Sequence, residues 1–171
     1  MFSSPTRVVL AVAALAYGLW LVAAQEYRGL VLVLVAILLI VGYFRYGTVW
    51  LACRALRKGD SSRADRLLSE IRYPEKLSPQ NLAYYNLVKG AIAAERGDLN
   101  SATQLLDASQ RGALRTSNDR SLVSCYLAHL ALKRGDRVGA QRHLEQARSQ
   151  KHRPSVEALI NNVQTAFSSE G

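Results

Sequence analysis

The sequence predicts an all-α protein: an apolar helical hairpin followed by a stack of helical hairpins. The dipeptide Gly-Asp occurs as Gly59-Asp60, Gly97-Asp98 and Gly135-Asp136, which are 38 residues apart in both steps. Apolar residues between these dipeptides recur at helical spacing. The first 44 residues contain two long apolar segments without a charged side chain. Self-similarity at a fixed period indicates stacked helical units, and the apolar segments indicate membrane helices.

The two apolar segments predict a transmembrane hairpin within residues 1–44. They contain 17 and 16 residues without a charge, slightly fewer than the roughly 20 that cross a bilayer. Both can be extended, the second because Arg45 can reach the membrane interface with its long side chain. We therefore predict spans at about residues 8–25 and 29–46. The short connection between them makes the two helices antiparallel neighbours.

An alternative interpretation of the first segment is a signal peptide. Arg7, the apolar stretch and a possible cleavage site at Val22-Ala23-Ala24 fit that pattern. The second apolar segment follows at once, which favours a retained hairpin. A hairpin buried in a globular core is a further alternative, but the rest of the chain is too small to bury two such helices.

The charge distribution predicts the orientation of the hairpin. The connection between the spans carries one Arg and one Glu. Basic residues follow the second span closely: Arg45, Arg54, Arg57, Lys58, Arg63 and Arg66. Because cytoplasmic flanks of membrane helices are rich in Lys and Arg, both termini and the repeats are predicted to be cytoplasmic. The same residues could attract anionic lipid headgroups.

The first repeat, residues 45–77, is predicted to hold helices at Thr48–Arg57 and Ser61–Arg72. Gly59 ends the first helix because glycine adopts the left-handed conformation without steric cost. Asp60 then suits the N-cap of the second helix, as Asp98 and Asp136 do in the later repeats. A basic residue precedes each glycine of the repeat set, and an alanine follows it by five positions.

The second repeat, residues 78–116, contains the longest predicted helix, Pro79–Arg96. Ser78 provides its cap, and Pro79 is favoured at a first helical position. Its apolar residues recur at helical spacing: Leu82, Tyr85, Val88 and Ile92. The partner helix is predicted at Leu99–Gln110.

The third repeat, residues 117–153, is predicted to hold helices at Asp119–Arg134 and Arg137–Gln150. Ser117-Asn118-Asp119 offers capping chemistry for the first of them. Pro154-Ser155 starts a last helix, residues 154–168, that should cover the open end of the third repeat. A terminal repeat without such a cap would expose its apolar face to water.

This arrangement resembles the tetratricopeptide repeat (TPR) family from about Arg45 to Gln150, in a membrane-anchored form of bacterial type. Small residues match in both helices of each repeat: Ala52, Gly90 and Ala128, then Ala64, Ala102 and Ala140. The chain departs from the pattern where the family has an aromatic residue, with Thr48, Asn86 and Ser124 in its place. Its period is 38 rather than about 34. The resemblance implies an α-solenoid of three repeats with a capping helix.

The resemblance also implies a binding groove, because the first helix of each TPR repeat forms most of the concave wall. The matching positions are Tyr46, Val49, Cys53, Arg57, Tyr84, Leu87, Ala91, Glu95, Leu122, Cys125, His129 and Lys133. They are mostly apolar and lack the Lys/Asn pattern of repeats that bind a terminal carboxylate. An apolar segment or an amphipathic helix is the ligand they favour. Alternatively, these residues only contact neighbouring repeats.

Nothing in the sequence indicates catalysis, a cofactor or a metal site. His129, His143 and His152 lack metal-ligand spacing. Cys53 and Cys125 are isolated and suit buried, reduced thiols. Gly59-Asp60-Ser61-Ser62 is faintly similar to a lipase nucleophile block, but the Gly-Asp pair recurs without that serine. No phosphate loop or nucleic-acid-binding motif is present, so nucleic acid is an unlikely partner.

The function expected from these features is that of a membrane-anchored adaptor. It would present the groove to a protein or peptide at the cytoplasmic face of a bacterial inner membrane. The alternative is a structural or assembly subunit of an integral membrane complex, bound mainly through the hairpin. The small-residue pair Ala14 and Gly18 would then contact other membrane helices.

Overall fold

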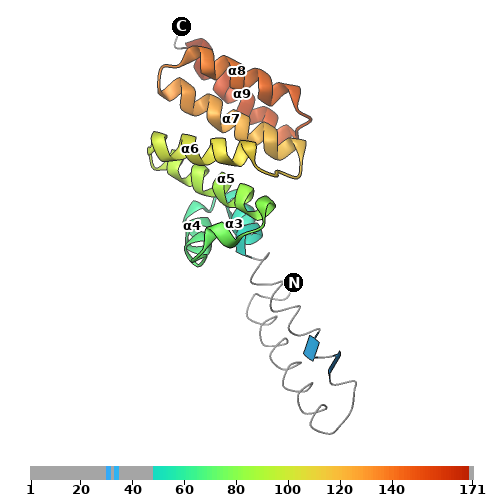
Figure 1. Ribbon diagram of the computed structural model, residues 1–171. Coiled ribbons are helices and arrows are strands. Elements are labelled where there is room, and N and C mark those ends of the chain that lie inside the picture. The colour runs from blue at the N-terminus through green and yellow to red at the C-terminus, as the bar shows by residue number, and fades with distance from the viewer. Residues whose placement is uncertain (1–29, 32, 35–47, 170–171) are drawn as a thin grey trace. The chain divides into compact units, whose positions relative to one another are not determined.

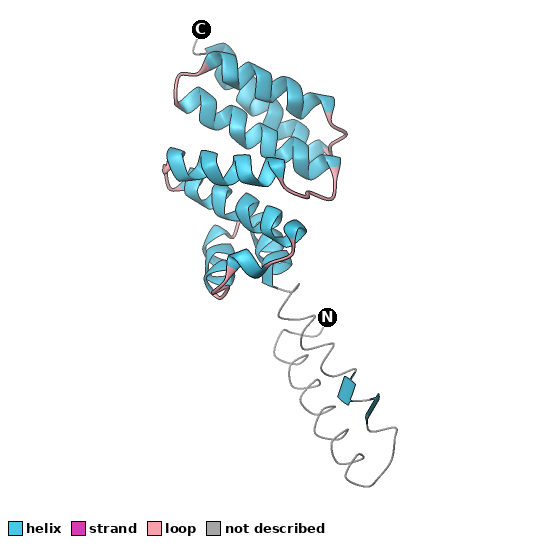
Figure 2. Ribbon diagram, viewed as in Figure 1, coloured by secondary structure: helices cyan, strands magenta, loops and turns pink. Residues whose placement is uncertain are grey.

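The computed structural model describes residues 30–31, 33–34 and 48–169, and every regular element among them is helical (Figure 2). This confirms the all-α class. The chain forms two compact units, Met1–Thr48 and Val49–Gly171. No helix in the described part of the chain has the length and apolar character needed to cross a bilayer. The predicted spans lie outside the described residues, apart from positions 30–31 and 33–34, which are helical.

The second unit consists of consecutive helical hairpins and a last helix (Figure 1). Its helices are α3 (Thr48–Leu56), α4 (Ser61–Ser69), α5 (Pro79–Glu95), α6 (Leu99–Arg111), α7 (Ser117–Lys133), α8 (Arg137–Ser149) and α9 (Pro154–Ser169). A short 3-10 helix, η2 (Pro74–Lys76), joins the first hairpin to the second. All of these α-helices lie where the sequence predicts them. α4 ends at Ser69, earlier than the predicted Arg72.

The three Gly-Asp turns share one backbone geometry. The φ angles of Gly59, Gly97 and Gly135 are +77°, +81° and +76°. This left-handed conformation is the reason that each turn has glycine.

The aspartates of these turns are N-caps, as the sequence predicts. The carboxylates of Asp60, Asp98 and Asp136 accept hydrogen bonds from the backbone N–H three residues later, at 2.9, 3.1 and 2.8 Å. Asp136 differs from the other two in its surroundings. Its carboxylate lies against Gly139, where an added Cβ would collide with Oδ2. The first two repeats have Arg63 and Ser101 at that position, so the third turn is not an identical copy.

The N-cap of α5 is the residue that the sequence predicts, whereas the N-cap of α7 is a different one. Ser78 caps α5, accepting a hydrogen bond from the Asn81 backbone N–H at 3.3 Å. α7 is capped by Thr116 rather than by the Ser117-Asn118-Asp119 segment, which forms the first turn of the helix. The reason is that Thr116 has the extended backbone of an N-cap and accepts from the Asp119 N–H.

Small residues allow the paired helices to approach closely. All five matched alanines are fully buried: Ala52, Ala64, Ala102, Ala128 and Ala140. At Gly90 an added Cβ would lie 2.8 Å from Cγ of Leu106. One apolar core joins α3 to α7, and a second joins α7 and α8 to α9. α9 contributes Val156, Ile160 and Val163 to the second core, so it covers the end of the third hairpin.

Candidate functional site

The residues predicted to form the groove differ in exposure from one repeat to the next. In the second repeat Tyr84, Leu87 and Ala91 are buried in the core, and only Glu95 is exposed. In the first repeat Val49 and Cys53 are buried. These five buried side chains are covered within the fold and offer no surface to a partner. Tyr46 lies outside the described residues.

The third repeat has an open groove at the predicted positions. Leu122, Cys125 and His129 of α7 line a cavity of about 270 Å³. The remaining lining residues are Tyr126 of α7 and Leu159, Asn162, Val163 and Ala166 of α9. Lys133 is exposed at the end of α7 and does not line the cavity. The groove therefore lies between the last repeat and the capping helix.

The place of this groove follows from the way the repeats stack. Tyr84, at the matching position in α5, is turned toward the next repeat, where its hydroxyl meets Asp119 of α7. Leu122 is the equivalent residue in α7, and the helix packed on this face is the single α9. Leu122 and Phe167 are only partly buried against the second core. A single helix covers less of the face than a helical pair would, so part of it stays open.

The groove is apolar and uncharged near neutral pH. Burial lowers the pKa of His129, and the nearby Lys133 lowers it further, so the imidazole is neutral at pH 7. Burial raises the pKa of the Cys125 thiol to about 11, so it is protonated. Asn162 supplies a polar amide. Such a surface can bind an apolar side chain.

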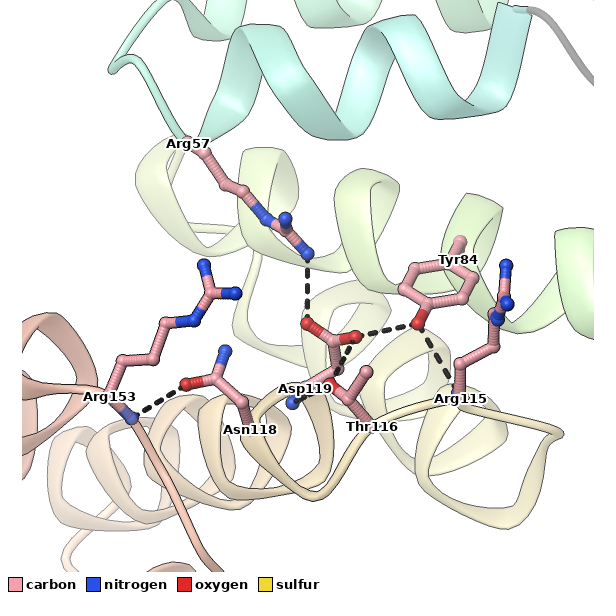
Figure 3. Close-up of polar contacts among 7 residues, drawn as sticks. All are labelled: Arg57, Tyr84, Arg115, Thr116, Asn118, Asp119 and Arg153. Atoms are coloured by element: carbon pink, nitrogen blue, oxygen red, sulfur yellow. Dashed lines mark hydrogen bonds and ion pairs between the residues drawn. The ribbon is translucent and has the colours of Figure 1, made fainter.

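A buried polar cluster, which sequence reasoning missed, surrounds Asp119 (Figure 3). Its Oδ1 accepts a hydrogen bond from Nη2 of Arg57 at 2.9 Å. Its Oδ2 accepts from the hydroxyls of Tyr84 and Thr116, at 2.6 and 2.7 Å. Arg57 belongs to the first predicted repeat and Tyr84 and Thr116 belong to the second, while Asp119 itself lies in the third. The sequence shows an acidic residue three positions after Thr116, but gives no sign of the two distant donors.

Arg57 is held in place on two sides. Its guanidinium lies 5.7 Å from the ring centroid of Trp50 and also pairs with Asp119. Trp50 meets the Tyr84 ring edge to face, with centroids 5.9 Å apart. Although Arg57 belongs to both the predicted basic set and the predicted groove, its charge is committed to contacts between repeats.

The other basic residues after the predicted second span are more available. Arg54, Lys58, Arg63 and Arg66 are exposed, and none has an acidic partner among the described residues. Arg45 lies outside the described residues. These four cations can therefore meet an external partner.

A second cavity, of about 530 Å³, lies where α4, α5 and α6 meet. It is more polar than the groove between α7 and α9. Nη2 of Arg96 and Oδ2 of Asp65 pair across it at 2.6 Å, joining α5 to the preceding α4. Nζ of Lys89 donates to the Tyr85 hydroxyl at 3.1 Å. Its charged side chains therefore already contact polar groups of the cavity wall.

The other two histidines belong to local contacts. His152 pairs with Glu157 at the start of α9, and this contact raises the pKa of the imidazole. His143 is half-buried in α8, where burial lowers its pKa. Among the described residues no three potential metal ligands come together.

Comparison of the chain with protein families, with curated proteins and with solved structures finds no match.

Proposed function

We propose that this protein is a membrane-anchored adaptor with a TPR-like α-solenoid. Its groove between α7 and α9 would bind an apolar segment or an amphipathic helix of a protein partner at the cytoplasmic membrane face. The observation that supports this best is the cavity itself. Three of the residues marked by the repeat pattern, Leu122, Cys125 and His129, line it together with α9.

The size and lining of the groove support a peptide rather than a cofactor. Small-molecule sites usually have volumes of about 300–1,000 Å³ and several convergent polar groups. This cavity, at about 270 Å³, is smaller and mostly apolar. It has room for one or two large side chains, which is the usual anchoring mode of a helix in a groove.

The TPR-like part of the proposal is supported by the repeated turns. Three glycines in the same left-handed conformation, each followed by an aspartate N-cap, recur at the sequence period. The membrane part is supported by the apolar segments. Leu30, Val31 and Leu34 are helical and largely exposed, as residues facing lipid would be.

Leu159 offers a direct test of the groove. It is 40% exposed and lines the cavity, whereas Val138 of α8 is 82% exposed and does not. Leu159→Glu introduces a charge that an apolar partner would bury on binding. We expect it to reduce partner recovery from solubilised native membranes more than tenfold, or by about 1.4 kcal/mol. Val138→Glu, with the same charge change, should retain the partner, and both variants should keep their helical content.

Two outcomes would count against the groove. Equal partner recovery with Leu159→Glu and with the parent chain would exclude it as the binding site. If removal of residues 1–44 then abolished recovery from solubilised extracts, the alternative would replace the adaptor: a subunit of an integral membrane complex that binds through its hairpin.

A further inference from the structure

Each repeat after the first turns a defined face toward the helix pair that precedes it. In the second repeat, Arg96 of α5 pairs with Asp65 of α4. In the third, Arg134 of α7 reaches back to α6. Its Nη2 donates to the Leu99 carbonyl and to Oδ1 of Asn100, at 2.8 and 2.7 Å. The basic residue before each of these Gly-Asp turns thus marks the face that meets the preceding repeat.

The residues of this face in the second repeat are known from the cavity that they line. They include Lys89, Ile92 and Arg96 of α5 and Ser101 and Gln104 of α6. One period earlier, the matching residues are Leu51, Arg54, Lys58, Arg63 and Arg66. We call these five the N-terminal end face. α3 is the first helix of its compact unit, so no earlier helix of that unit meets this face.

The chemistry of the end face differs from that of its counterpart. Arg54 occupies the position of Ile92, which is buried against the preceding repeat. Arg63 and Arg66 occupy the positions of the neutral Ser101 and Gln104. With Lys58 the end face carries four exposed cations. Asp60, at the start of α4, caps that helix and carries one negative charge beside these four cations, so the face keeps an excess of positive charge.

Exposed apolar side chains lie beside these cations. Leu51 is 37% exposed and belongs to the face, and Trp50, one turn before Arg54 on α3, is 52% exposed. Large apolar and aromatic groups next to Lys and Arg are typical of surfaces that bind the headgroup region of a membrane. The cations lie singly on two helices rather than around a pocket, which favours a broad anionic surface over a small anion.

We propose that the N-terminal end face binds the anionic surface of a bilayer. This inference rests on the proposed membrane anchoring and adds a second contact to it. The predicted second span ends at about residue 46, and α3 begins at Thr48. Because each residue extends a chain by at most about 3.6 Å, the first turn of α3 stays near the headgroups in any orientation of the unit. In the second repeat, Arg96 donates a hydrogen bond to the carboxylate of Asp65. For the cations of the end face, the phosphate oxygens of the headgroups would be the acceptors.

The test uses the full chain with Trp20→Phe, which leaves Trp50 as the single tryptophan. The protein is reconstituted in vesicles of phosphatidylcholine alone or with about 30% phosphatidylglycerol, a density of negative charge that attracts basic segments. Acrylamide quenching of Trp50 emission then measures its access to water. We expect quenching to fall about twofold in the anionic vesicles, and the difference to disappear in high salt.

Paired variants assign the effect to the face. Arg63→Gln with Arg66→Gln should abolish the difference between the two lipids. Arg142→Gln with Arg148→Gln removes the same charge from exposed positions on α8 and should preserve it. Equal loss in both pairs would overturn the assignment to this face.

Three further outcomes are informative. Equal quenching of the parent chain in both lipids, with the protein firmly in the vesicles, overturns the bilayer contact and leaves the anchoring intact. Protection of Trp50 by polyglutamate but not by anionic vesicles would assign the face to an acidic protein instead. Failure of the chain to float with any vesicle would contradict the membrane anchoring itself.

Discussion

Asp119 concentrates more side-chain hydrogen bonds than any other carboxylate in the described part of the molecule. A buried carboxylate is costly unless its oxygens are fully hydrogen-bonded. Here three donors, the side chains of Arg57, Tyr84 and Thr116, satisfy both oxygens. Because an isolated buried carboxylate would be unstable, removal of any one donor should also weaken the hydrogen bonds that the other two make to Asp119.

Tyr84 provides a pH-dependent measure of this cluster. Burial and the hydrogen bond to Asp119 raise its pKa to about 12, from an ordinary value of 10. Its contribution to stability is therefore complete below about pH 10 and is lost as the pH rises toward 12, because the unfolded chain ionises first. We expect the parent chain to be more stable than Tyr84→Phe at pH 8, and this advantage to shrink between pH 10 and 12. Thermal melting followed by circular dichroism at each pH would measure this difference in stability.

The matched control for this measurement is Tyr73→Phe. Tyr73 is 58% exposed, in contrast to the buried Tyr84. Its replacement should change the melting temperature little at any pH. An advantage of the parent chain over Tyr84→Phe that stayed constant up to pH 12 would contradict the role given to the buried hydroxyl.

At the scale of the element, the Gly-Asp turn explains why the helices could be placed from the sequence. Glycine φ and aspartate capping are local properties, so they can be read from adjacent residues. The end of α4 could not be placed in the same way. Apolar spacing continues through Ile71, but the chain leaves the helix at Ser69 and forms η2 from Pro74. Apolar spacing alone therefore does not mark the residue at which this helix ends.

Gly97→Ala tests the turn in isolation. An added Cβ would meet no atom within 4 Å, so the cost comes from the backbone conformation alone. A left-handed φ costs an L-residue about 1–2 kcal/mol, and we expect the free energy of unfolding to fall by that amount. Gly97→Asn should cost less, because asparagine tolerates this region better. Equal stability of the alanine variant and the parent chain would exclude a conformational role for this glycine.

The repeat pattern predicts the residues of the candidate groove in the third repeat but not in the first two. The pattern marks equivalent positions in three repeats. Of these, Leu122, Cys125 and His129 line the groove, whereas the exposed Arg57, Glu95 and Lys133 do not. Tyr84 and Leu87 are buried, and Tyr84 meets the next repeat. Whether a position faces a neighbour or a groove depends on the next helices in the stack, and residues at equal spacing carry no information about them.

At the scale of the whole molecule, the orientation of the chain is open to a labelling test. We expect a cysteine at Glu26, in a background with Cys53→Ala and Cys125→Ala, to react with an impermeant thiol reagent in intact cells, because cytoplasmic flanks carry the positive charge. A cysteine at the exposed Arg148 should react only after permeabilisation. The reverse pattern would invert the topology. A mature chain beginning at Gln25 would instead support the signal peptide.

The contacts of Asp119 have a consequence for how the second unit unfolds. Repeat arrays usually behave as one-dimensional systems in which each unit is stabilised only by its nearest neighbours, so their ends can melt separately. Here the carboxylate of Asp119, in the third predicted repeat, joins Arg57 of the first repeat to Tyr84 and Thr116 of the second. Unfolding of the first repeat would break the hydrogen bond between Arg57 and Asp119 and so lower the stability of the third repeat. This next-nearest-neighbour coupling should make the three hairpins melt as one cooperative transition.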